Sequence, residues 1–232
     1  MIEKTEIWLT CKDLLTLSTD TNTVFDGKAV RGFLGNMYRN RMEFHGHKGD
    51  KLVYKHPLIQ YKIFGSSALV IGLKEGSYLL KAVPNLEYLE IYRQKYPILK
   101  QNTCVTSVPF GLTDGTFRYT FSTPWTGLNE DNYKNYLALK DDKDKIYGLF
   151  EKILIGNILS MSKSLGYVVD DKIRLKARLN ENGTARVKDG VELMAFLGDF
   201  ETNFMIPEFW GIGKFSSRGY GTVRCINGGN PQ

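Results

Sequence analysis

Apolar side chains in the first half of the chain follow strand and helix periods in turn. Within 27–41 they recur at the i, i+3, i+4, i+7 spacing of one helix face. Gly65, Ser66 and Ser67 separate two short apolar runs, which is a hairpin pattern. In chain order, the elements that we predict are a strand at 6–17, a helix at 27–41, strands at 58–64 and 68–73, a helix through Leu86, Leu89, Glu90 and Tyr92, and a strand at 103–109.

The second half repeats this order with different residues. A long helix with one apolar face runs to about Leu165, and Gly166 is the type of residue that ends such a helix. The tetrapeptide at 180–183, Asn-Glu-Asn-Gly, has the residues of a hairpin turn between two strands. In chain order, we predict a strand at 117–121, a helix at 144–165, strands at 172–179 and 184–188, an apolar run at 191–200, a brief segment at 207–210 and a strand at 222–225.

This order of elements predicts an α+β chain built from two ferredoxin-like (RRM-like) βαββαβ domains in tandem. Gly111, Asp114 and Gly115 gather turn-forming residues between the two sets of elements. We therefore expect an N-terminal domain at 1–112 and a C-terminal domain at 113–232. Each domain is long enough to bury a core of its own.

The composition of the 232 residues is that of an ordinary globular protein, with 42% hydrophobic and 24% charged residues. No stretch approaches the roughly 18 consecutive apolar residues of a membrane-spanning helix, and the first residues carry acids where a signal peptide carries basic residues. We expect a cytoplasmic protein without a membrane partner. Cys11, Cys104 and Cys225 form no C-x-x-C pair, which favours neither a disulfide framework nor a thiolate zinc site.

The positive charge of the chain is concentrated in one segment. Lys and Arg total 31 against 25 Asp and Glu, a net charge of +6, and the segment 28–62 alone holds eight basic and two acidic residues. All three histidines lie in it beside several tyrosines. A positive field among aromatic rings suits single-stranded or loop RNA more than duplex DNA, although a solvated basic face without a partner is the alternative. Lys28, Arg31 and Arg39 lie opposite the apolar face of the predicted helix and are candidates for RNA contact.

A glycine-rich loop, GIGKFSSRGYG, lies at 211–221. Its glycines allow positive φ and close approach of another backbone, which can expose N–H groups to phosphate oxygens, and Tyr220 would add a stacking surface. A P-loop would need glycine where Glu208 stands, and a dinucleotide fingerprint would need glycine at Ser216, so neither commoner motif fits. A purely structural turn is the alternative. The residues that we expect to contact RNA here are Gly211, Gly213, Lys214, Arg218, Gly219, Tyr220 and Gly221.

Candidate chemistry lies in the segment FHGHKGDKLVYKHP at 44–57. His45 and His47 are two residues apart, so in an extended chain both imidazoles would face one way, with Lys51 and Tyr54 within reach. RNA strand scission needs a base for the proton of a ribose 2′-hydroxyl and an acid for the departing 5′-oxygen, and histidine can do either near neutral pH. Lysine can stabilise the charge on the pentacoordinate phosphorus, and tyrosine can orient or donate a proton.

Other uses of these histidines stay open. A metal site would have only Glu43 and Asp50 as nearby carboxylates, which is a thin ligand set, and we expect neither a metal nor a cofactor. Simple contact with RNA or with solvent is a further alternative. His56 precedes Pro57 and is expected to be extended at the start of a strand, so we leave it out of the site.

The loop and the histidine segment resemble a known family. The loop resembles the glycine-rich signature of the repeat-associated RNA-binding (RAMP) superfamily of CRISPR systems. Its place before the last strand of a tandem ferredoxin-like chain resembles the CRISPR repeat endoribonuclease, the sixth CRISPR-associated family ("Cas six"). The segment HPLIQYKIFGSSALVIGL at 56–73, with the histidines ahead of it, is similar to the subtype-b branch of that family.

The resemblance implies a protein that binds CRISPR repeat RNA, as precursor and as product, and cuts once within each repeat without a metal. Members of the family leave a 5′-hydroxyl and a 2′,3′-cyclic or 3′-phosphate, and their catalytic histidine lies after the first helix. Carried over to this chain, this makes His47 the first choice for acid–base catalysis and His45 the second, with Lys51 and Tyr54 in support. It also allows a homodimer and subunits of the CRISPR interference complex as partners.

Two rivals come from other classes. A non-cutting RNA-binding subunit of a CRISPR effector complex shares the fold and the glycine-rich loop, and only the histidine pair argues against it. A zinc-dependent nuclease is a more distant rival that a chelator would silence.

Overall fold

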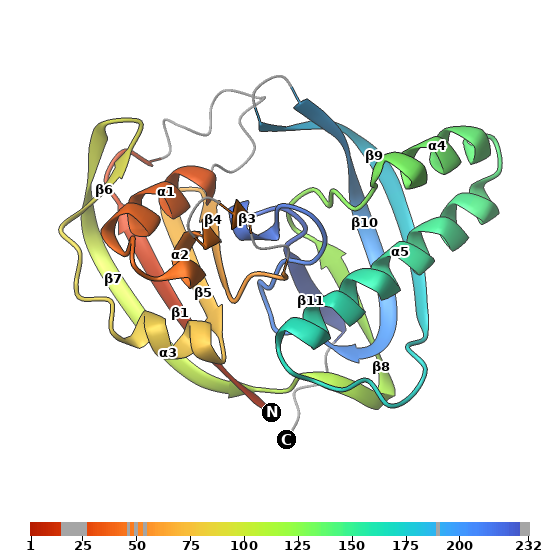
Figure 1. Cartoon of the computed structure of the whole chain (residues 1–232), viewed down its shortest axis with the longest axis horizontal. Coiled ribbons are helices and arrows are strands. Elements are labelled where there is room, and N and C mark those ends of the chain that lie inside the picture. The colour runs from red at the N-terminus through yellow and green to blue at the C-terminus, as the bar shows by residue number, and fades with distance from the viewer. Residues whose placement is uncertain (15–26, 46, 49–50, 53–54, 189–190, 228–232) are drawn as a thin grey trace. The chain divides into compact units, whose positions relative to one another are not determined.

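The computed structural model describes residues 1–14, 27–45, 47–48, 51–52, 55–188 and 191–227, which form two compact units (Figure 1). Unit 1 comprises Met1–Val108 and Ser217–Gly219, and unit 2 comprises Pro109–Ser216 and Tyr220–Gln232. The main division thus falls between Val108 and Pro109. The short segment Ser217–Gly219 clusters with unit 1, although it belongs to the glycine-rich loop of the second half.

Unit 1 is built on a five-stranded antiparallel sheet in the order β4-β5-β1-β7-β6. Within it, the order β7-β1-β5-β4 is that of a ferredoxin-like fold, with β6 added at one edge. The elements of unit 1 are β1 (Ile2–Cys11), α1 (Gly27–Met37), α2 (Met42–His45), β2 (His47–Lys48), β3 (Lys51–Leu52), β4 (Ile59–Phe64), β5 (Ser67–Leu73), α3 (Glu75–Lys81), β6 (Tyr88–Ile91) and β7 (Gln94–Val108). The strands β2 and β3 form a two-stranded sheet of their own among the described residues.

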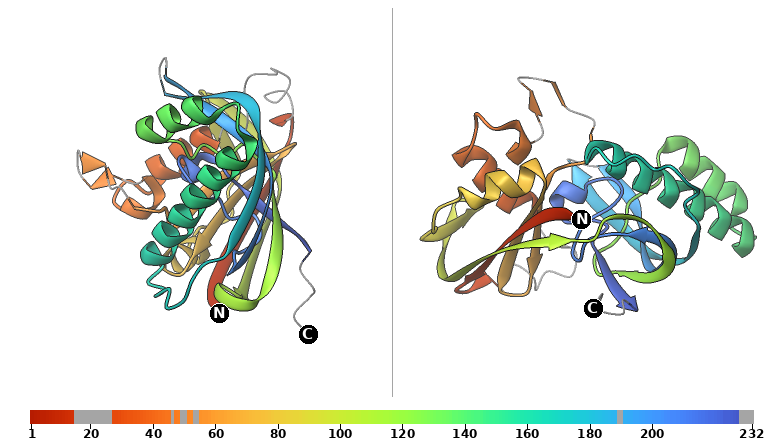
Figure 2. Two further views of the ribbon diagram at one scale, coloured as in Figure 1. Left: turned by 90° about the vertical axis from the view of Figure 1, so that its right-hand side faces the viewer. Right: turned by 90° about the horizontal axis from the view of Figure 1, so that it is seen from below.

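Helices α1 and α3 cover one face of this sheet (Figure 2). The strands turn alternate residues such as Ile7, Tyr61 and Val70 to that face, and these meet Val30 and Leu34 of α1. Because Val30 and Leu34 are four residues apart, they share one side of the helix. The helix predicted at 27–41 is therefore confirmed over its first three turns, but it ends at Met37 and a second short helix follows.

Unit 2 repeats the strand arrangement in the order β11-β8-β10-β9. Its elements are β8 (Gly111–Phe121), α4 (Glu130–Leu139), α5 (Lys143–Ser164), β9 (Leu175–Lys188), β10 (Val191–Met205) and β11 (Val223–Asn227). All residues between Met205 and Val223 are described, and they contain no α-helix, so the glycine-rich loop takes the place of the second helix. The predicted fold class, two ferredoxin-like units in tandem, is confirmed.

The long helix of unit 2 agrees with its prediction to within a residue at each end. Asp142 caps its start by accepting a hydrogen bond from the Lys145 backbone N–H. Its apolar side packs on the sheet, where Phe150 and Phe196 have ring centroids 4.8 Å apart. Gly166 follows the last turn with φ of 61°, as expected. No helix among the described residues combines the length and the apolar character that a membrane crossing requires.

The hairpin predicted around Gly65 is confirmed, because β4 and β5 pair with Phe64 opposite Ser67. The helix predicted through Leu86, Leu89, Glu90 and Tyr92 is wrong. Residues Tyr88–Ile91 are strand β6, in which Leu89 and Ile91 alternate into the core. A four-residue window fits both periods, and pairing with β7 selects the strand.

The hairpin turn predicted at 180–183 is also wrong. These residues lie inside β9, where Asn180 pairs with Leu197 and Glu181 with Phe196 of β10. The pairing register shifts between Met194 and Phe196, and Gly183, with φ of 71°, stands opposite this irregularity. The glycine signal therefore marked a β-bulge instead of a chain reversal. Helices α3 and α4 lie where no helix was predicted.

Candidate nucleic-acid interface and candidate catalytic histidines

His45 is the last residue of α2 and is held against α1. Its ring Nε2–H donates to the backbone carbonyl of Arg39, with a nitrogen–oxygen distance of 3.0 Å. A carbonyl can only accept, so the neutral ring carries its proton on Nε2 and its lone pair on Nδ1. The side chain of Arg31 donates to the His45 carbonyl, which ties the end of α2 to the middle of α1.

The helix that carries His45 is anchored on both sides. The preceding residue, Phe44, is buried and stacks on Tyr38 with ring centroids 4.4 Å apart. The hydroxyl of Tyr61, which is buried in the core, donates to the Phe44 carbonyl at 2.9 Å. A partly exposed imidazole on such an anchored turn has a defined position for proton transfer.

The other predicted catalytic residues are placed only in part. His47 begins β2 and pairs with Leu52, while Lys48 pairs with Lys51 of β3, so one small hairpin carries His47 and Lys51. The side chains of these two residues, and Tyr54 as a whole, lie outside the described residues. The expectation that both imidazoles project from one extended chain is wrong, because His45 ends a helix before the strand of His47 begins.

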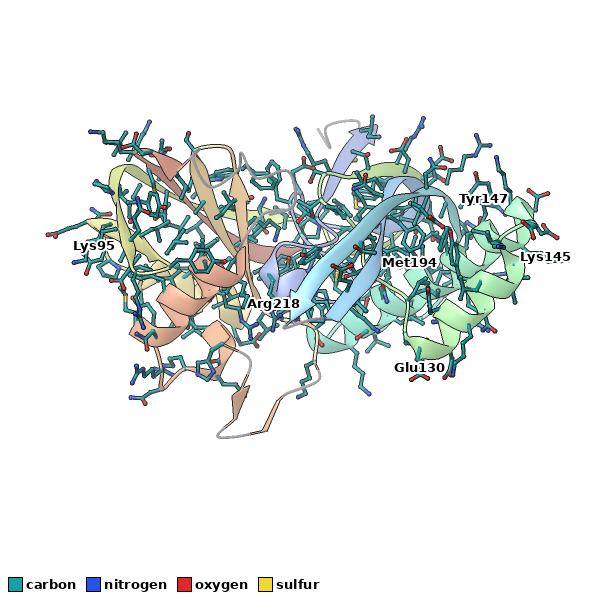
Figure 3. The ribbon with its side chains drawn as sticks, turned by 90° about the horizontal axis from the view of Figure 1, so that it is seen from above. Lys95, Glu130, Lys145, Tyr147, Met194 and Arg218 are labelled. Carbon is teal, nitrogen blue, oxygen red and sulfur yellow. The ribbon has the colours of Figure 1, made fainter. Side chains whose placement is uncertain are left out.

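The three basic residues expected to contact RNA have different surroundings: Lys28 and Arg31 lie on α1, and Arg39 follows its end. Lys28 is exposed, and so is Arg39, whose Nε donates to the Asn36 side chain at 2.6 Å. Arg31 is partly buried, and its pKa is lowered by burial and, after that, by the charge of Arg218. Arg218, labelled in Figure 3, belongs to the loop segment that clusters with unit 1. Two guanidinium groups that repel each other attract an anion to the space around them.

A groove of about 840 Å³ runs over the exposed side of α1 in unit 1. One wall comes from α1 and the residues after it, including Lys28, Arg39 and His45, and the other comes from the β6–β7 hairpin. The hairpin contributes Tyr88, Glu90, Tyr92 and Arg93. The structure thus brings Lys28, Arg39 and His45 together in one groove.

The glycine-rich loop is more tightly built into the protein than expected. The backbone N–H of Ile212 donates to the Gly221 carbonyl at 2.9 Å, that of Gly221 to the Pro124 carbonyl at 2.8 Å, and that of Lys214 to the Thr126 carbonyl at 3.0 Å. These three N–H groups are therefore not presented to a ligand. Gly213 and Gly221 allow close approach to Trp125, which is fully buried.

Two side chains of the loop also differ from their predicted roles. Tyr220 is only 8% exposed and packs in a cluster with Ala185, Ala195 and Phe215, so little of its ring is presented for stacking, and its contact with RNA stays a prediction. The Lys214 ammonium donates to the Leu128 carbonyl at 2.8 Å, and partial burial lowers its pKa. Of the loop's two cations, Arg218 is thus the one that lies with the α1 residues.

A second polar cluster lies inside unit 1, where no prediction placed one. Lys62 of β4 is fully buried, and its ammonium donates to the Gln60 side chain at 2.9 Å. Burial lowers the pKa of Lys62 to about 7, opposed by the charge of Glu6. The Gln60 amide in turn donates to His56 Nε2 at 3.3 Å, and burial together with the Lys62 charge lowers the pKa of His56 to about 3. His56 is therefore neutral near pH 7.

Within the ranges given above for the structure, no three or more His, Cys, Asp or Glu side chains gather in a way that could hold a metal ion. The residues that sequence reasoning missed are those of the β6–β7 hairpin, chiefly Tyr88, Tyr92 and Arg93. Their aromatic and basic character is visible in the sequence, but the wrong helix prediction hid that they form a turn opposite α1.

Comparison with known proteins gives the same family over nearly the whole chain. Residues 12–108 match the family described as the Cas6b N-terminal domain, and residues 111–226 match the Cas6b C-terminal domain. A crystal structure of Cas6b is 33% identical with a TM-score of 0.81, over 97% of this chain and 99% of that one. A crystal structure of the CRISPR RNA processing endoribonuclease Cas6b is 32% identical with a TM-score of 0.72, over 97% and 100% of the two chains. An uncharacterized protein of Methanocaldococcus jannaschii is 38% identical over 139 residues, 60% of this chain and 92% of that protein.

Proposed function

This chain belongs to the Cas6b family of CRISPR RNA processing endoribonucleases, and we propose that it cuts precursor CRISPR RNA within each repeat, in the cytoplasm, by metal-independent catalysis at His47 and His45. The observation that supports this most is the position of His45, which lines the groove beside Lys28 and Arg39. An acid–base group next to cations is what cleavage of a phosphodiester requires.

The proposed reaction is an internal displacement. The ribose 2′-oxygen attacks the neighbouring phosphorus, the bond from phosphorus to the 5′-oxygen breaks, and a 2′,3′-cyclic phosphate and a 5′-hydroxyl result. One group takes the proton of the 2′-hydroxyl and another gives a proton to the departing 5′-oxygen. His45 is the second choice for one of these tasks, and its ring is oriented by the hydrogen bond from Nε2–H to the Arg39 carbonyl. His47 remains our first choice for the principal catalyst, with Lys51 and Tyr54 in support.

RNA binding is proposed for the cations on α1 and for the loop at 211–221. The mutual repulsion of Arg31 and Arg218 supports a phosphate position between the α1 face and the loop segment that clusters with it. We propose that Gly213 and Gly221 shape the loop by close packing, and that the loop meets the RNA chiefly through Arg218, which clusters with unit 1. Precursor and product repeat RNA are the partners. A homodimer and subunits of the interference complex are protein partners that remain compatible with the family.

Cleavage of repeat RNA in excess EDTA tests the proposal most directly. We expect the purified protein to cut in EDTA, and a 2′-deoxy substitution immediately upstream of the cut to stop cleavage while leaving binding nearly unchanged. Loss of cleavage in EDTA would favour a zinc-dependent nuclease, and binding without any cleavage would favour an RNA-binding subunit.

Histidine variants test the mechanism. Replacing His45 and His47 together by Ala should slow single-turnover cleavage by about 10²-fold or more, since positioned acid–base catalysis contributes about 10² to 10⁴. Met42→Ala is the matched control, because Met42 is exposed on the same short helix as His45 and should cut at the wild-type rate. Wild-type cleavage by the double variant would exclude both histidines as the acid–base groups.

A further inference from the structure

The turn of the β6–β7 hairpin is an exposed part of the groove that the proposed catalysis does not use. Tyr92 and Arg93 form this turn and have positive φ angles of 52° and 66°. Positive φ at both central residues is what a two-residue hairpin turn requires. The turn lifts the side chain of Tyr92, which is 69% exposed, away from the core.

The strand before the turn adds a second aromatic ring. Leu89 and Ile91 are buried in the core, whereas Tyr88 is only partly buried and lines the groove. The Lys95 ammonium lies 4.0 Å from the centroid of the Tyr88 ring, and Lys95 marks this end of the sheet in Figure 3. The Phe33 ring of α1 lies 6.1 Å from the Tyr88 ring. The ring of Tyr88 is thus held between a cation and the helix.

The charge of the groove favours an anionic ligand. Among the described lining residues, Lys28, Arg39 and Arg93 are basic and Glu90 is acidic, and Phe33 adds an apolar ring. An exposed ring beside several cations is the arrangement by which proteins bind single-stranded nucleic acid, because the rings stack on bases and the cations follow the phosphates.

We propose that the groove between α1 and the β6–β7 turn is a stacking subsite for an unpaired nucleotide of the repeat, with the base on Tyr92 and the adjoining phosphate near Arg93. His45 lines the same groove, so a strand that lies along it runs from the stacking ring to the imidazole. The subsite would hold the nucleotides that flank the cut. This proposal rests on the proposed function, because it takes repeat RNA as the ligand.

Affinity measurements on the full chain test the subsite. The probe is repeat RNA with a 2′-deoxy sugar at the cut, titrated by fluorescence anisotropy. Tyr92→Leu keeps an apolar side chain but removes the ring, and should weaken binding by about 5-fold to 150-fold, the loss expected for one base-stacking ring. Tyr92→Trp should bind as wild type does. The matched control is Tyr78→Leu, since Tyr78 is 73% exposed on α3 of the same unit and should not change binding.

Two further readouts separate stacking from charge. Arg93→Gln should lower the slope of log affinity against log salt by about 1, whereas Tyr92→Leu should leave the slope unchanged. Abasic nucleotides placed one at a time along the RNA should weaken binding to the wild-type protein at one position near the cut. The same abasic RNA should bind Tyr92→Leu no more weakly than the intact RNA does. The subsite is refuted by wild-type affinity in Tyr92→Leu, or by an equal loss in Tyr78→Leu, even if the protein cuts RNA. A protein that binds through Tyr92 but does not cut would refute the proposed catalysis and leave the subsite standing.

Discussion

Replacing Gly213 by Ala should cost far more stability than the same change at Gly183, although both glycines have positive φ. Gly213 has φ of 88°, and a Cβ placed there would lie 2.6 Å from Trp125 Nε1 and 3.1 Å from Asn157 Oδ1. Gly183 has φ of 71°, and a Cβ there meets no atom within 4 Å. Both variants therefore carry the strain of a positive φ, but only at Gly213 would the new Cβ clash with Trp125 and Asn157.

The size of the difference follows from the bond that the new Cβ would disrupt. The Trp125 indole N–H donates to the Asn157 side chain at 3.0 Å and thereby joins a fully buried ring to α5. Left-handed backbone in alanine costs about 1 to 2 kcal/mol, and a buried donor without its acceptor costs about 1 to 3 kcal/mol more. We expect Gly183→Ala to lose about 1 to 2 kcal/mol and Gly213→Ala about 2 to 5 kcal/mol.

Urea unfolding without RNA, followed by tryptophan fluorescence, measures both losses of stability. The loss follows from the shift of the urea midpoint, provided that the dependence of the unfolding free energy on urea concentration does not change. A double-mutant cycle with Asn157→Ala identifies the cause, because two changes that break one bond should together cost less than their sum, by about 0.5 to 3 kcal/mol. Equal losses at Gly213 and Gly183, or strict additivity in the cycle, would refute the reasoning. The result would also decide whether the loop's glycines serve close packing, as the engaged N–H groups indicate.

Two further predictions concern stability. Between about pH 7 and 10.5 an unfolded Lys62 holds a proton that the buried amine, whose pKa is lowered to about 7, has released. The unfolded state then binds more protons, so the free energy of unfolding should rise with pH in this window by about 1.4 kcal/mol per pH unit. Urea titrations at several pH values measure this rise. Lys62→Met should abolish it, whereas the control Lys100→Met, at an exposed position, should leave it unchanged. Gly148 and Gly156 lie inside α5, and a Cβ at either position would meet open space. Gly148→Ala and Gly156→Ala should therefore each raise the free energy of unfolding by about 0.5 to 1 kcal/mol, measured by thermal unfolding. A loss of stability at either site would contradict the helix geometry.

Long periodic segments were predictable because their pattern excludes other structures. The α5 face repeats its apolar residues over six turns, which no strand can use, and Gly166 marks its end. The β4–β5 hairpin was predictable for a similar reason, since two apolar runs flank a short turn. Short segments failed where two structures share one pattern. Leu89 and Ile91 suit a helix or a strand, and only pairing with β7 selected the strand.

The candidate site divides in the same way between sequence and tertiary structure. Residue types and local spacing were enough to single out the histidine segment, the α1 cations and the glycine-rich loop, because their chemistry does not depend on distant neighbours. Tertiary packing decided which of these side chains are exposed to a ligand. Tyr220 is buried, the Lys214 ammonium donates to the Leu128 carbonyl, and Arg218 lies near Arg31. It also placed the turn of Tyr92 opposite α1, across more than fifty residues of chain. Burial and proximity between distant residues arise only when sheets and helices pack, and for that reason no local pattern could have encoded them.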